Sequence, residues 1–429
     1  MTSLETSTTG ALVGPAAPLR RSWRNSWIYG VLTVLGAVLL VGFARGGDAR
    51  FALASRTDLF ALPTVSLPGA ATGFVVVLVA AACTGVSIAL VLTGRKQPLW
   101  LPIVFALALV LGLLVWATAG AGQTLTVPGL LAGSLGLAVP LIFGALGGVV
   151  SERVGVVNVA IEGQLLAGAF VAAVAASLTR SLVVGLLAAM VAGMLVSFVL
   201  AAFAIKYLVD QVIVGVVLNV LVLGLTNFLY TLVLVPASAT LNSPPSFTPI
   251  AIPVLSAIPI VGPVLFQQTV IVYLMYVAVI VVTYGLFRTR WGLRLRAVGE
   301  HPQAADTVGI KVGATRFWNV SLAGAIAGLG GAYLTLASVP SFTKDVTSGA
   351  GFIALAAVIF GRWNPVRATL AALLFGFASN LQNVLSIVGS TVPPDFLLML
   401  PYVVTIFAVA GLVGQVRGPA ASGKPYIKG

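Results

Sequence analysis

The side chains that could do chemistry in this chain are few, because only 8% of its 429 residues are charged and 59% are hydrophobic. Asn158 and Glu162 are four residues apart, so a helix would place both on one face. Other amides that interrupt apolar runs are Asn219, Asn380 and Asn383. Amides and a carboxylate together offer the donors and acceptors that bind a polar solute, although amides also commonly join neighbouring helices.

Neither a catalytic centre nor a metal site is predicted. His301 is the only histidine, and the loop around it lacks the set of partners that nucleophilic or metal chemistry needs. Cys83 is the only cysteine, so the sequence allows no intrachain disulfide and no cysteine cluster.

The elements that must position these side chains are membrane spans. The mean hydropathy is +1.10, and apolar runs of about 20 residues, the length that crosses a bilayer, recur along the chain. They lie near 27–43, 72–93, 99–119, 128–150, 160–179, 182–204, 211–235, 269–287, 316–338, 350–361, 368–388 and 396–414. The run at 350–361 is short and could be re-entrant. We therefore expect an all-α, polytopic membrane bundle of 10–12 transmembrane helices.

The distribution of basic residues predicts the orientation of these spans. Alternating the spans from a cytoplasmic N-terminus puts eighteen of the 23 Lys and Arg residues on one side and five on the other. This asymmetry is typical of cytoplasmic loops, so we expect both termini in the cytoplasm. The excess of basic residues then needs no nucleic-acid partner.

A polar segment, "GLRLRAVGEHPQAADTVGIKVGATR" at 292–316, separates two apolar runs. Its pattern predicts a short helix that begins at Pro302 and ends at Gly309. Small Ala304 and Ala305 would suit docking of this helix in a groove of another protein, whereas an ordinary basic connector would explain only the arginines.

"GEHPQAADTVGI" in this segment resembles the coupling segment of permease subunits in ATP-binding-cassette importers, the branch that carries nucleosides, simple sugars and branched-chain amino acids. Three further stretches resemble its nucleoside permeases: "SERVGVVNVAIEGQLLAGAF" at 151–170, "IPVLSAIPIVGPVLF" at 252–266 and "SGAGFIALAAVIFGRWNPVRA" at 348–368. The resemblance implies a permease core at 128–414 with a coupling loop at 288–316. Around it we expect a disordered tail at 1–26, an extension at 27–127 and a tail at 415–429.

The resemblance also implies partners. They are a separate cytoplasmic ATPase that uses the ATP, a second permease subunit that would form a heterodimer, and an extracellular solute-binding protein or lipoprotein. The chain itself would hold no cofactor and lie in a bacterial inner membrane, among its lipids. The residues that correspond to the ATPase-coupling motif are Gly299, Glu300, His301, Pro302, Ala304, Ala305, Gly309 and Ile310. The nucleoside would be contacted by Glu162, Asn158, Asn380, Asn383 and Asn219.

The run "GPAASGK" at 418–424 fits the spacing of a phosphate-binding loop, but Pro425 stands where a magnesium-binding Ser or Thr is needed. We therefore expect no ATPase activity in this chain. Two alternatives stay open: a permease for simple sugars, and a self-sufficient ion- or proton-coupled carrier that uses Glu152, Glu162 and Asp210. The segment 236–268, with seven prolines, could be a lid, a docking surface or a rigid connector.

Overall fold

The computed structural model describes residues 23–54, 58–60, 62–98, 100–120, 122–387, 399 and 417–427. The expected tail up to residue 22 and the expected span at 396–414 lie outside these residues, except for residue 399. Two compact units divide the chain: residues 1–49 with 67–120, and residues 50–66 with 121–429. The expected boundaries of the extension, 27–127, and the permease core, 128–414, stay predictions.

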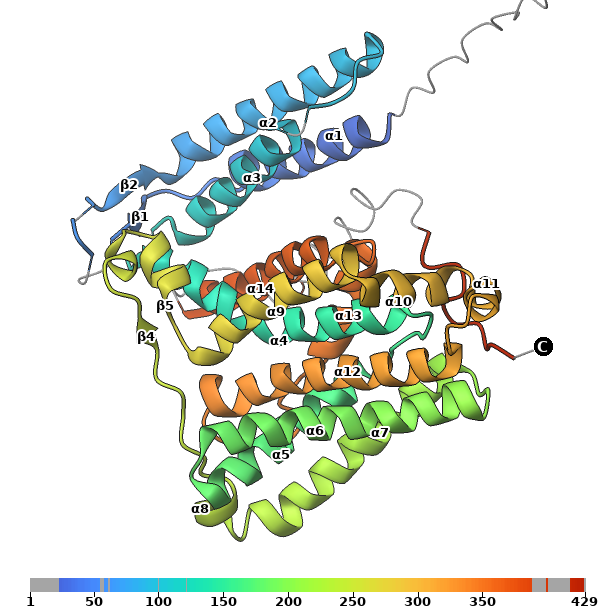
Figure 1. Ribbon diagram of the computed structural model, residues 1–429. Coiled ribbons are helices and arrows are strands. Elements are labelled where there is room, and N and C mark those ends of the chain that lie inside the picture. The colour runs from blue at the N-terminus through green and yellow to red at the C-terminus, as the bar shows by residue number, and fades with distance from the viewer. Residues whose placement is uncertain are drawn as a thin grey trace, which may run out of the picture. The chain divides into compact units, whose positions relative to one another are not determined.

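The first unit is a bundle of three helices, α1 (Arg24–Ala37), α2 (Gly69–Leu92) and α3 (Trp100–Thr118) (Figure 1). A π-helical turn at Val38–Gly42 extends α1. Polar contacts join α1 to α2, where the hydroxyls of Ser26 and Ser87 lie 2.7 Å apart and those of Thr33 and Thr84 lie 2.9 Å apart. In a lipid environment such hydroxyl pairs fix which faces of two helices meet.

The second unit holds eleven helices among the described residues. They are α4 (Val127–Arg153), α5 (Ile161–Thr179), α6 (Leu182–Ala201), α7 (Gln211–Leu229), α8 (Ser238–Leu241), α9 (Val270–Arg288), α10 (Arg290–Glu300), α11 (Pro302–Thr307), α12 (Val312–Tyr333), α13 (Ala350–Phe360) and α14 (Pro365–Ile387). π-Helical turns extend α6 to Lys206, α7 to Leu234 and α12 to Ser338, and another lies at Gly262–Phe266.

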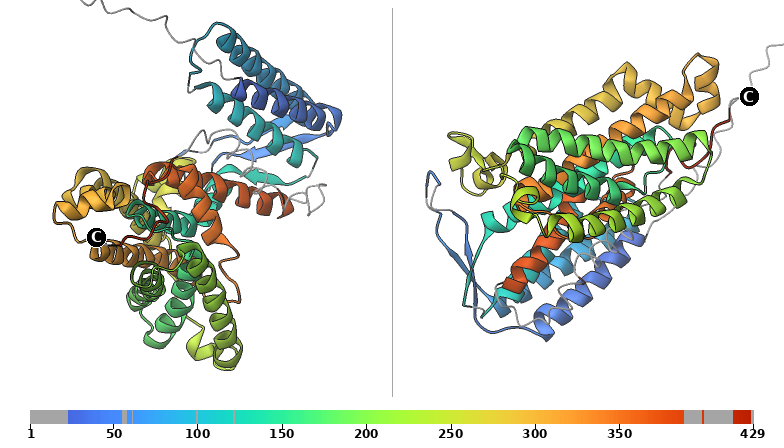
Figure 2. Two further views of the ribbon diagram at one scale, coloured as in Figure 1. Left: turned by 90° about the vertical axis from the view of Figure 1, so that its right-hand side faces the viewer. Right: turned by 90° about the horizontal axis from the view of Figure 1, so that it is seen from below.

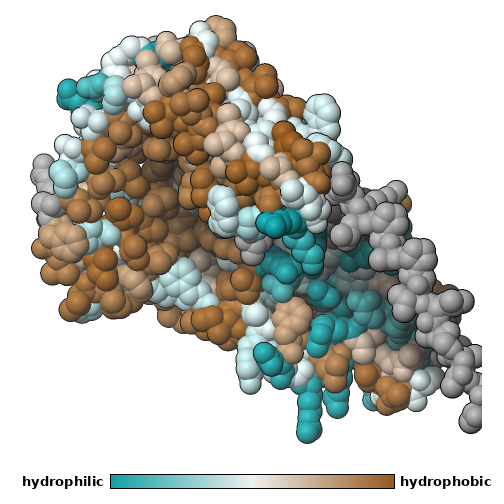
Figure 3. Space-filling view, turned by 90° about the horizontal axis from the view of Figure 1, so that it is seen from above, coloured by the Kyte–Doolittle hydropathy of each residue, from teal (hydrophilic) through white to brown (hydrophobic). Residues whose placement is uncertain are grey.

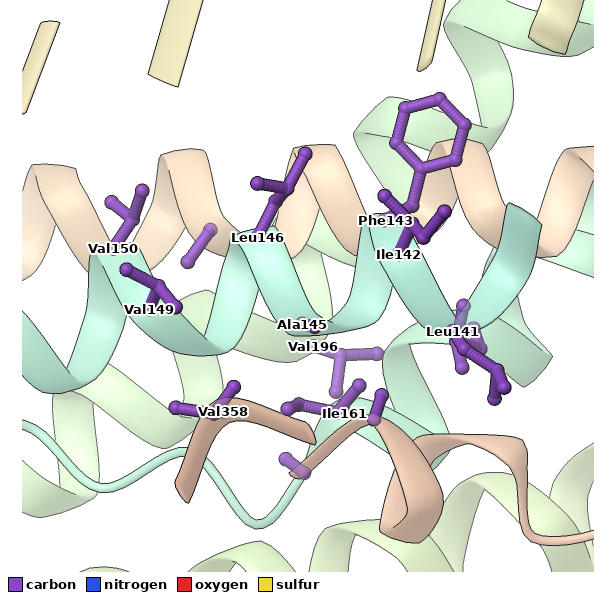
Figure 4. Close-up of a cluster of buried hydrophobic side chains, with 14 of the residues drawn as sticks. Leu141, Ile142, Phe143, Ala145, Leu146, Val149, Val150, Ile161, Val196 and Val358 are labelled. Atoms are coloured by element: carbon purple, nitrogen blue, oxygen red, sulfur yellow. The ribbon is translucent and has the colours of Figure 1, made fainter. Parts of the chain in front are cut away.

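Helix α4 is the centre of this unit. It packs against α9, α12, α13 and α14, and its apolar side chains point in every direction (Figure 4). Phe143, Leu146 and Val149 are fully buried, and Ile161 of α5 and Val358 of α13 close the cluster around them. A helix that is apolar on all sides is expected inside a bundle rather than at its surface.

Glycines let α12 approach α6 closely in the same unit (Figure 1). A Cβ atom added at Gly193 would lie 2.2 Å from the carbonyl oxygen of Gly324, and one at Gly328 would lie 2.2 Å from that of Ala189. Only residues without a side chain allow these backbones to meet, as is common between membrane helices.

Short strands occur in the connections. β1 (Asp48–Ala52) lies between β2 (Val65–Pro68) and β3 (Thr124–Thr126), and its pairing with β3 is parallel, with Arg50 opposite Thr124. The proline-rich segment 236–268 holds the antiparallel pair β4 (Ile250–Ala251) and β5 (Gln267–Gln268), with a 3₁₀ turn at Leu255–Ala257 between them.

Ten helices in the described part of the chain are long and apolar enough to cross a membrane, and each matches an expected span. The predicted polytopic helical bundle is confirmed, and the chain is a multi-pass membrane protein. Exposed hydrophobic side chains cover much of the surface that such helices offer to lipid (Figure 3). The predicted short helix is α13, whose 11 residues are about half a bilayer-spanning length.

Candidate functional site

The connection between α4 and α5 is irregular backbone held inside the second unit. α4 ends at Arg153, Gly155 turns the chain with a φ of 95°, and α5 begins only at Ile161. Asn158 therefore precedes the helix, and the prediction that a helix places it on one face with Glu162 is wrong. The apolar run "VGVVNVA" disguises this break, because Gly155 alone marks it. Non-helical backbone that is buried in a membrane protein needs hydrogen-bond partners from the protein itself.

Side-chain amides supply several of those partners. Asn158 and Gln164 exchange two hydrogen bonds, of 3.1 and 3.0 Å, and Gln164 also donates to the Ser197 hydroxyl of α6 at 2.9 Å. The Val157 N–H donates to the Gln211 side chain at 2.7 Å. This network fixes the connection to α5, α6 and α7.

Asn219 of α7 binds the start of α5 from a second direction. Its Oδ1 accepts from the Gly163 N–H at 2.8 Å, and its Nδ2 donates to the Val159 carbonyl at 2.8 Å. Both ends of the amide are therefore used, and α7 is tied to the irregular connection as well as to the helix that follows.

Glu162 lies in the first turn of α5 and is 8% exposed. One carboxylate oxygen accepts from the Thr347 hydroxyl at 2.5 Å and the Gly349 N–H at 2.9 Å, and the other accepts from the Gly351 N–H at 2.6 Å. These donors surround the N-terminus of α13, whose unpaired N–H groups favour a negative charge. A Cβ atom at Gly351 would lie 2.3 Å from the Glu162 nitrogen, so the approach requires glycine there.

Of the five predicted substrate-contact residues, the structure gathers Asn158, Glu162 and Asn219 around the start of α5. The other two lie elsewhere, on α14. Asn380 donates to the Leu130 carbonyl of α4 at 2.7 Å, and Asn383 is exposed. Five other residues that hold this region were not predicted: Gln211, Ser197, Thr347, Gly349 and Gly351. The run "TSGAG" ahead of an apolar helix could have indicated the partners of a buried acid.

A cavity of ≈ 400 Å³ opens at the other end of α4, near Asn380. Its lining includes Gly129 and Ala132 of α4 together with Pro263 and Gln268 of the proline-rich segment. The lining is mostly apolar with a few amide groups, which is the usual composition of a small-molecule pocket.

The acids that a proton-coupled carrier would use as relays have structural partners. Glu152 accepts from the Trp363 indole N–H at 2.5 Å. Asp210 caps α7 by accepting from the N–H groups of Val212 and Ile213 at 2.9 and 3.0 Å. Together with the contacts of Glu162, these hydrogen bonds give each of the three acids a structural role, so a proton path is not needed to explain their presence.

The segment 299–312, here called the coupling segment, begins at the end of α10. Thr289 interrupts the helical path after α9 and caps α10 through the Gly292 N–H. At the far end of α10, a Cβ atom at Gly299 would lie 2.0 Å from the Arg153 carbonyl oxygen, so this glycine allows α10 to touch the end of α4. Glu300 is exposed at the last position of the helix.

The short helix predicted in the coupling segment is confirmed as α11, which starts at Pro302. His301 is the non-helical residue before it, and Gly309, with a φ of 87°, follows its end. Ala305 is buried and Ile310 packs partly against the core. The opposite side of the segment is exposed and includes His301, Gln303, Ala304, Val308 and Gly309. The docking role of these residues stays a prediction.

Comparison with known proteins places these features in a family. Residues 130–409 match the family described as the branched-chain amino acid transport system / permease component. The guanosine ABC transporter permease protein NupQ of Bacillus subtilis is 43% identical over 306 residues, which are 68% of this chain and 94% of that protein. The nucleoside ABC transporter permease protein NupC of Lactococcus lactis is 39% identical, over 67% of this chain and 93% of that protein. The guanosine ABC transporter permease protein NupP of Bacillus subtilis is 25% identical over 66% of this chain and 83% of its own length. No solved structure matches the chain significantly.

Proposed function

Because the chain belongs to the permease-component family of branched-chain amino acid transport systems, we propose that it is the nucleoside-conducting permease subunit of an ATP-driven importer. The observation that carries the nucleoside assignment is the 43% identity to a guanosine permease over 94% of that protein. The chain would form half of a translocation pathway, and a transport subunit of this kind makes and breaks no covalent bond.

The energy would come from a separate ATPase that binds ATP and docks on the coupling segment. Support comes from the coupling segment, in which buried Ala305 anchors α11 while Ala304 and the following Val308 are exposed. Val308, the residue directly after α11, is 75% exposed, and an apolar side chain displayed at the end of a short polar helix is suited to a groove in a partner. The basic side chains of α10 favour the cytoplasm for this end of the molecule, and with it both termini.

A second permease subunit and a solute-binding protein or lipoprotein complete the proposed importer. The two guanosine permease proteins of Bacillus subtilis that match this chain support a pair of unlike subunits. The proline-rich segment 236–268, on the side opposite α11 by the alternation of the spans, is proposed as the surface that receives the binding protein. Its cavity near Gln268 is a suitable external mouth for the pathway.

The nucleoside contacts are proposed at Asn158, Glu162 and Asn219, with Asn380 and Asn383 nearer the cavity. The first three bind partners within the protein, so contact with a nucleoside would require them to exchange those hydrogen bonds. An importer that alternates between two states has to rearrange such contacts, and an exchange keeps the cost of each state low.

The test is a charge placed on the docking surface. Val308→Asp puts a carboxylate directly after α11, and Val209→Asp is the matched control, because Val209 is also apolar and exposed but lies in the loop before α7. Both variants should insert normally. Val308→Asp should lose co-purification of the ATPase and nucleoside uptake together, whereas Val209→Asp should keep both. Normal ATPase recovery with Val308→Asp would contradict docking at this segment.

A further inference from the structure

The last described segment of the chain, residues 417–427, runs alongside the ends of α10 and α11 (Figures 1 and 2). It has no regular secondary structure, yet its backbone is bonded to the coupling segment. The Ala421 N–H donates to the Gly299 carbonyl at 2.9 Å, and the Ala420 N–H donates to the Glu300 carboxylate at 3.2 Å. Ala421 is buried in this contact.

The same segment reaches the start of α12 through Arg316. This side chain is 2% exposed, and its Nη1 donates to the Lys424 carbonyl at 3.0 Å. Its Nε and Nη2 are buried without a hydrogen-bond partner among the described residues. A Cβ atom at Gly155 would lie 2.9 Å from Nη2, so the guanidinium sits between the segment, the α4–α5 turn and α12. Losing the Lys424 carbonyl would leave a buried cation without its acceptor, which is costly.

Two side-chain contacts complete the attachment. The Tyr426 hydroxyl is hydrogen-bonded to Asp306 of α11. Desolvation and this hydrogen bond raise the pKa of Tyr426, against an opposing effect of Arg316, so the phenol stays protonated and continues to donate at physiological pH. At the other end, Gly418 lies against the Trp363 ring, where an added Cβ atom would be 3.0 Å from two ring carbons.

Residues 417–427, here called the C-terminal strap, thus touch α10, α11, the start of α12, the α4–α5 turn and the turn after α13. α11 alone has six residues and one buried side chain, so it has little of its own to hold it against the core. Resting on the proposed function, we infer that the C-terminal strap is a positioning element that makes α11 move as one body with α4, α5 and α12 and so carries the ATPase stroke to the translocation helices.

The run "GPAASGK" has a structural explanation in the strap. Gly418 leaves room for the indole ring of Trp363, and Gly423 has a φ of 76°, a conformation that glycine adopts without strain. The two glycines whose spacing resembles that of a phosphate-binding loop are therefore explained by the path of the strap along the coupling segment.

The inference is tested by loosening the strap in the complete transporter. Ala421→Pro removes the N–H that Gly299 accepts, and Tyr426→Phe removes only the hydroxyl bound to Asp306. Val209→Ala, at an exposed position in the loop before α7 and outside the strap, is the control. We expect both test variants to keep the ATPase bound and hydrolysing ATP while nucleosides moved per ATP fall by about fivefold or more, as coupling free energies usually allow, with Ala421→Pro the more severe. Hydrogen exchange of the strap peptide should be slow in the wild type and fast in Ala421→Pro.

Three outcomes separate the strap from the proposed function. Fast exchange of the strap without a change in nucleosides moved per ATP overturns the inference. If Ala421→Pro does not accumulate in the membrane, Tyr426→Phe decides the question alone. Slow hydrogen exchange of its strap, together with a wild-type number of nucleosides moved per ATP, also overturns the inference. If the wild-type chain binds no ATPase or moves no nucleoside, the proposed function fails, and the strap inference falls with it.

Discussion

Replacing Glu162 by alanine is the perturbation for which the structure gives the clearest magnitude. The carboxylate accepts from Thr347, Gly349 and Gly351, and all three donors lose their acceptor in Glu162→Ala. A buried donor that is left without its acceptor costs about 1–3 kcal/mol, so the loss of the acceptor for all three donors should cost about 3 kcal/mol or more. Glu162→Gln keeps one acceptor oxygen but turns an N–H₂ toward a donor, so we expect about half that loss.

The assay combines thermal unfolding of the purified complex with uptake. Thr347→Val removes one donor and leaves the carboxylate in place. If the contact anchors α13, the two substitutions should be non-additive, with an interaction energy of about 0.5–3 kcal/mol in a double-mutant cycle. Ser386→Ala, at an exposed position on α14, is the control and should change stability by less than about 0.5 kcal/mol.

The two roles of Glu162 give opposite results. If Glu162 is an anchor, its replacement should lower the thermal stability of the complex and the nucleoside uptake together. If Glu162 contacts the nucleoside, its replacement should lower uptake by about tenfold or more and leave the stability unchanged. A loss of this size is expected when one charge-assisted hydrogen bond is removed. A Glu162→Ala complex that unfolds at the wild-type temperature and shows no coupling to Thr347 would refute the anchoring argument.

Two further predictions concern topology and packing. Single cysteines at Val254 and Val308, 73% and 75% exposed, should on a cysteine-free background react oppositely with an impermeant maleimide on intact cells: Val254→Cys should be labelled and Val308→Cys should not. Labelling of Val308→Cys from outside would reverse the proposed orientation. Gly299→Ala brings a methyl group to 2.0 Å from the Arg153 carbonyl and should destabilise the protein by about 1–3 kcal/mol, measured by thermal unfolding. Gly313→Ala, whose Cβ would be 4.0 Å from its nearest neighbour, is the control and should be neutral or slightly stabilising. Equal melting temperatures of the two variants would contradict the close contact of α10 with α4.

The spans were predictable because each is a local property of about 20 consecutive residues. The run expected at 72–93 is α2, Gly69–Leu92, and the one at 182–204 is α6 with its π-helical turn, Leu182–Lys206. α11 was predictable for a similar reason, since Pro302 favours the first turn of a helix and Gly309 its end.

Features that depend on contacts between distant residues left little trace in the sequence. The four-residue spacing of Asn158 and Glu162 suits a helix, but Asn158 lies in a turn that Gln164 and the other network residues hold. The partners of Glu162 lie 185 or more residues away. The C-terminal strap was expected only as a tail, because it is attached chiefly through backbone groups, which every sequence possesses.

The measurement that tests the central claim most directly is nucleoside uptake into right-side-out vesicles that hold the complete transporter, loaded with ATP or without it, while an ionophore collapses the proton gradient. The vesicles also carry the solute-binding protein, and glucose serves as the competing solute. We predict uptake of labelled nucleoside that requires internal ATP, persists with the ionophore and is unaffected by excess glucose. Uptake that ignores ATP and disappears with the ionophore would contradict the account and favour an ion-coupled carrier.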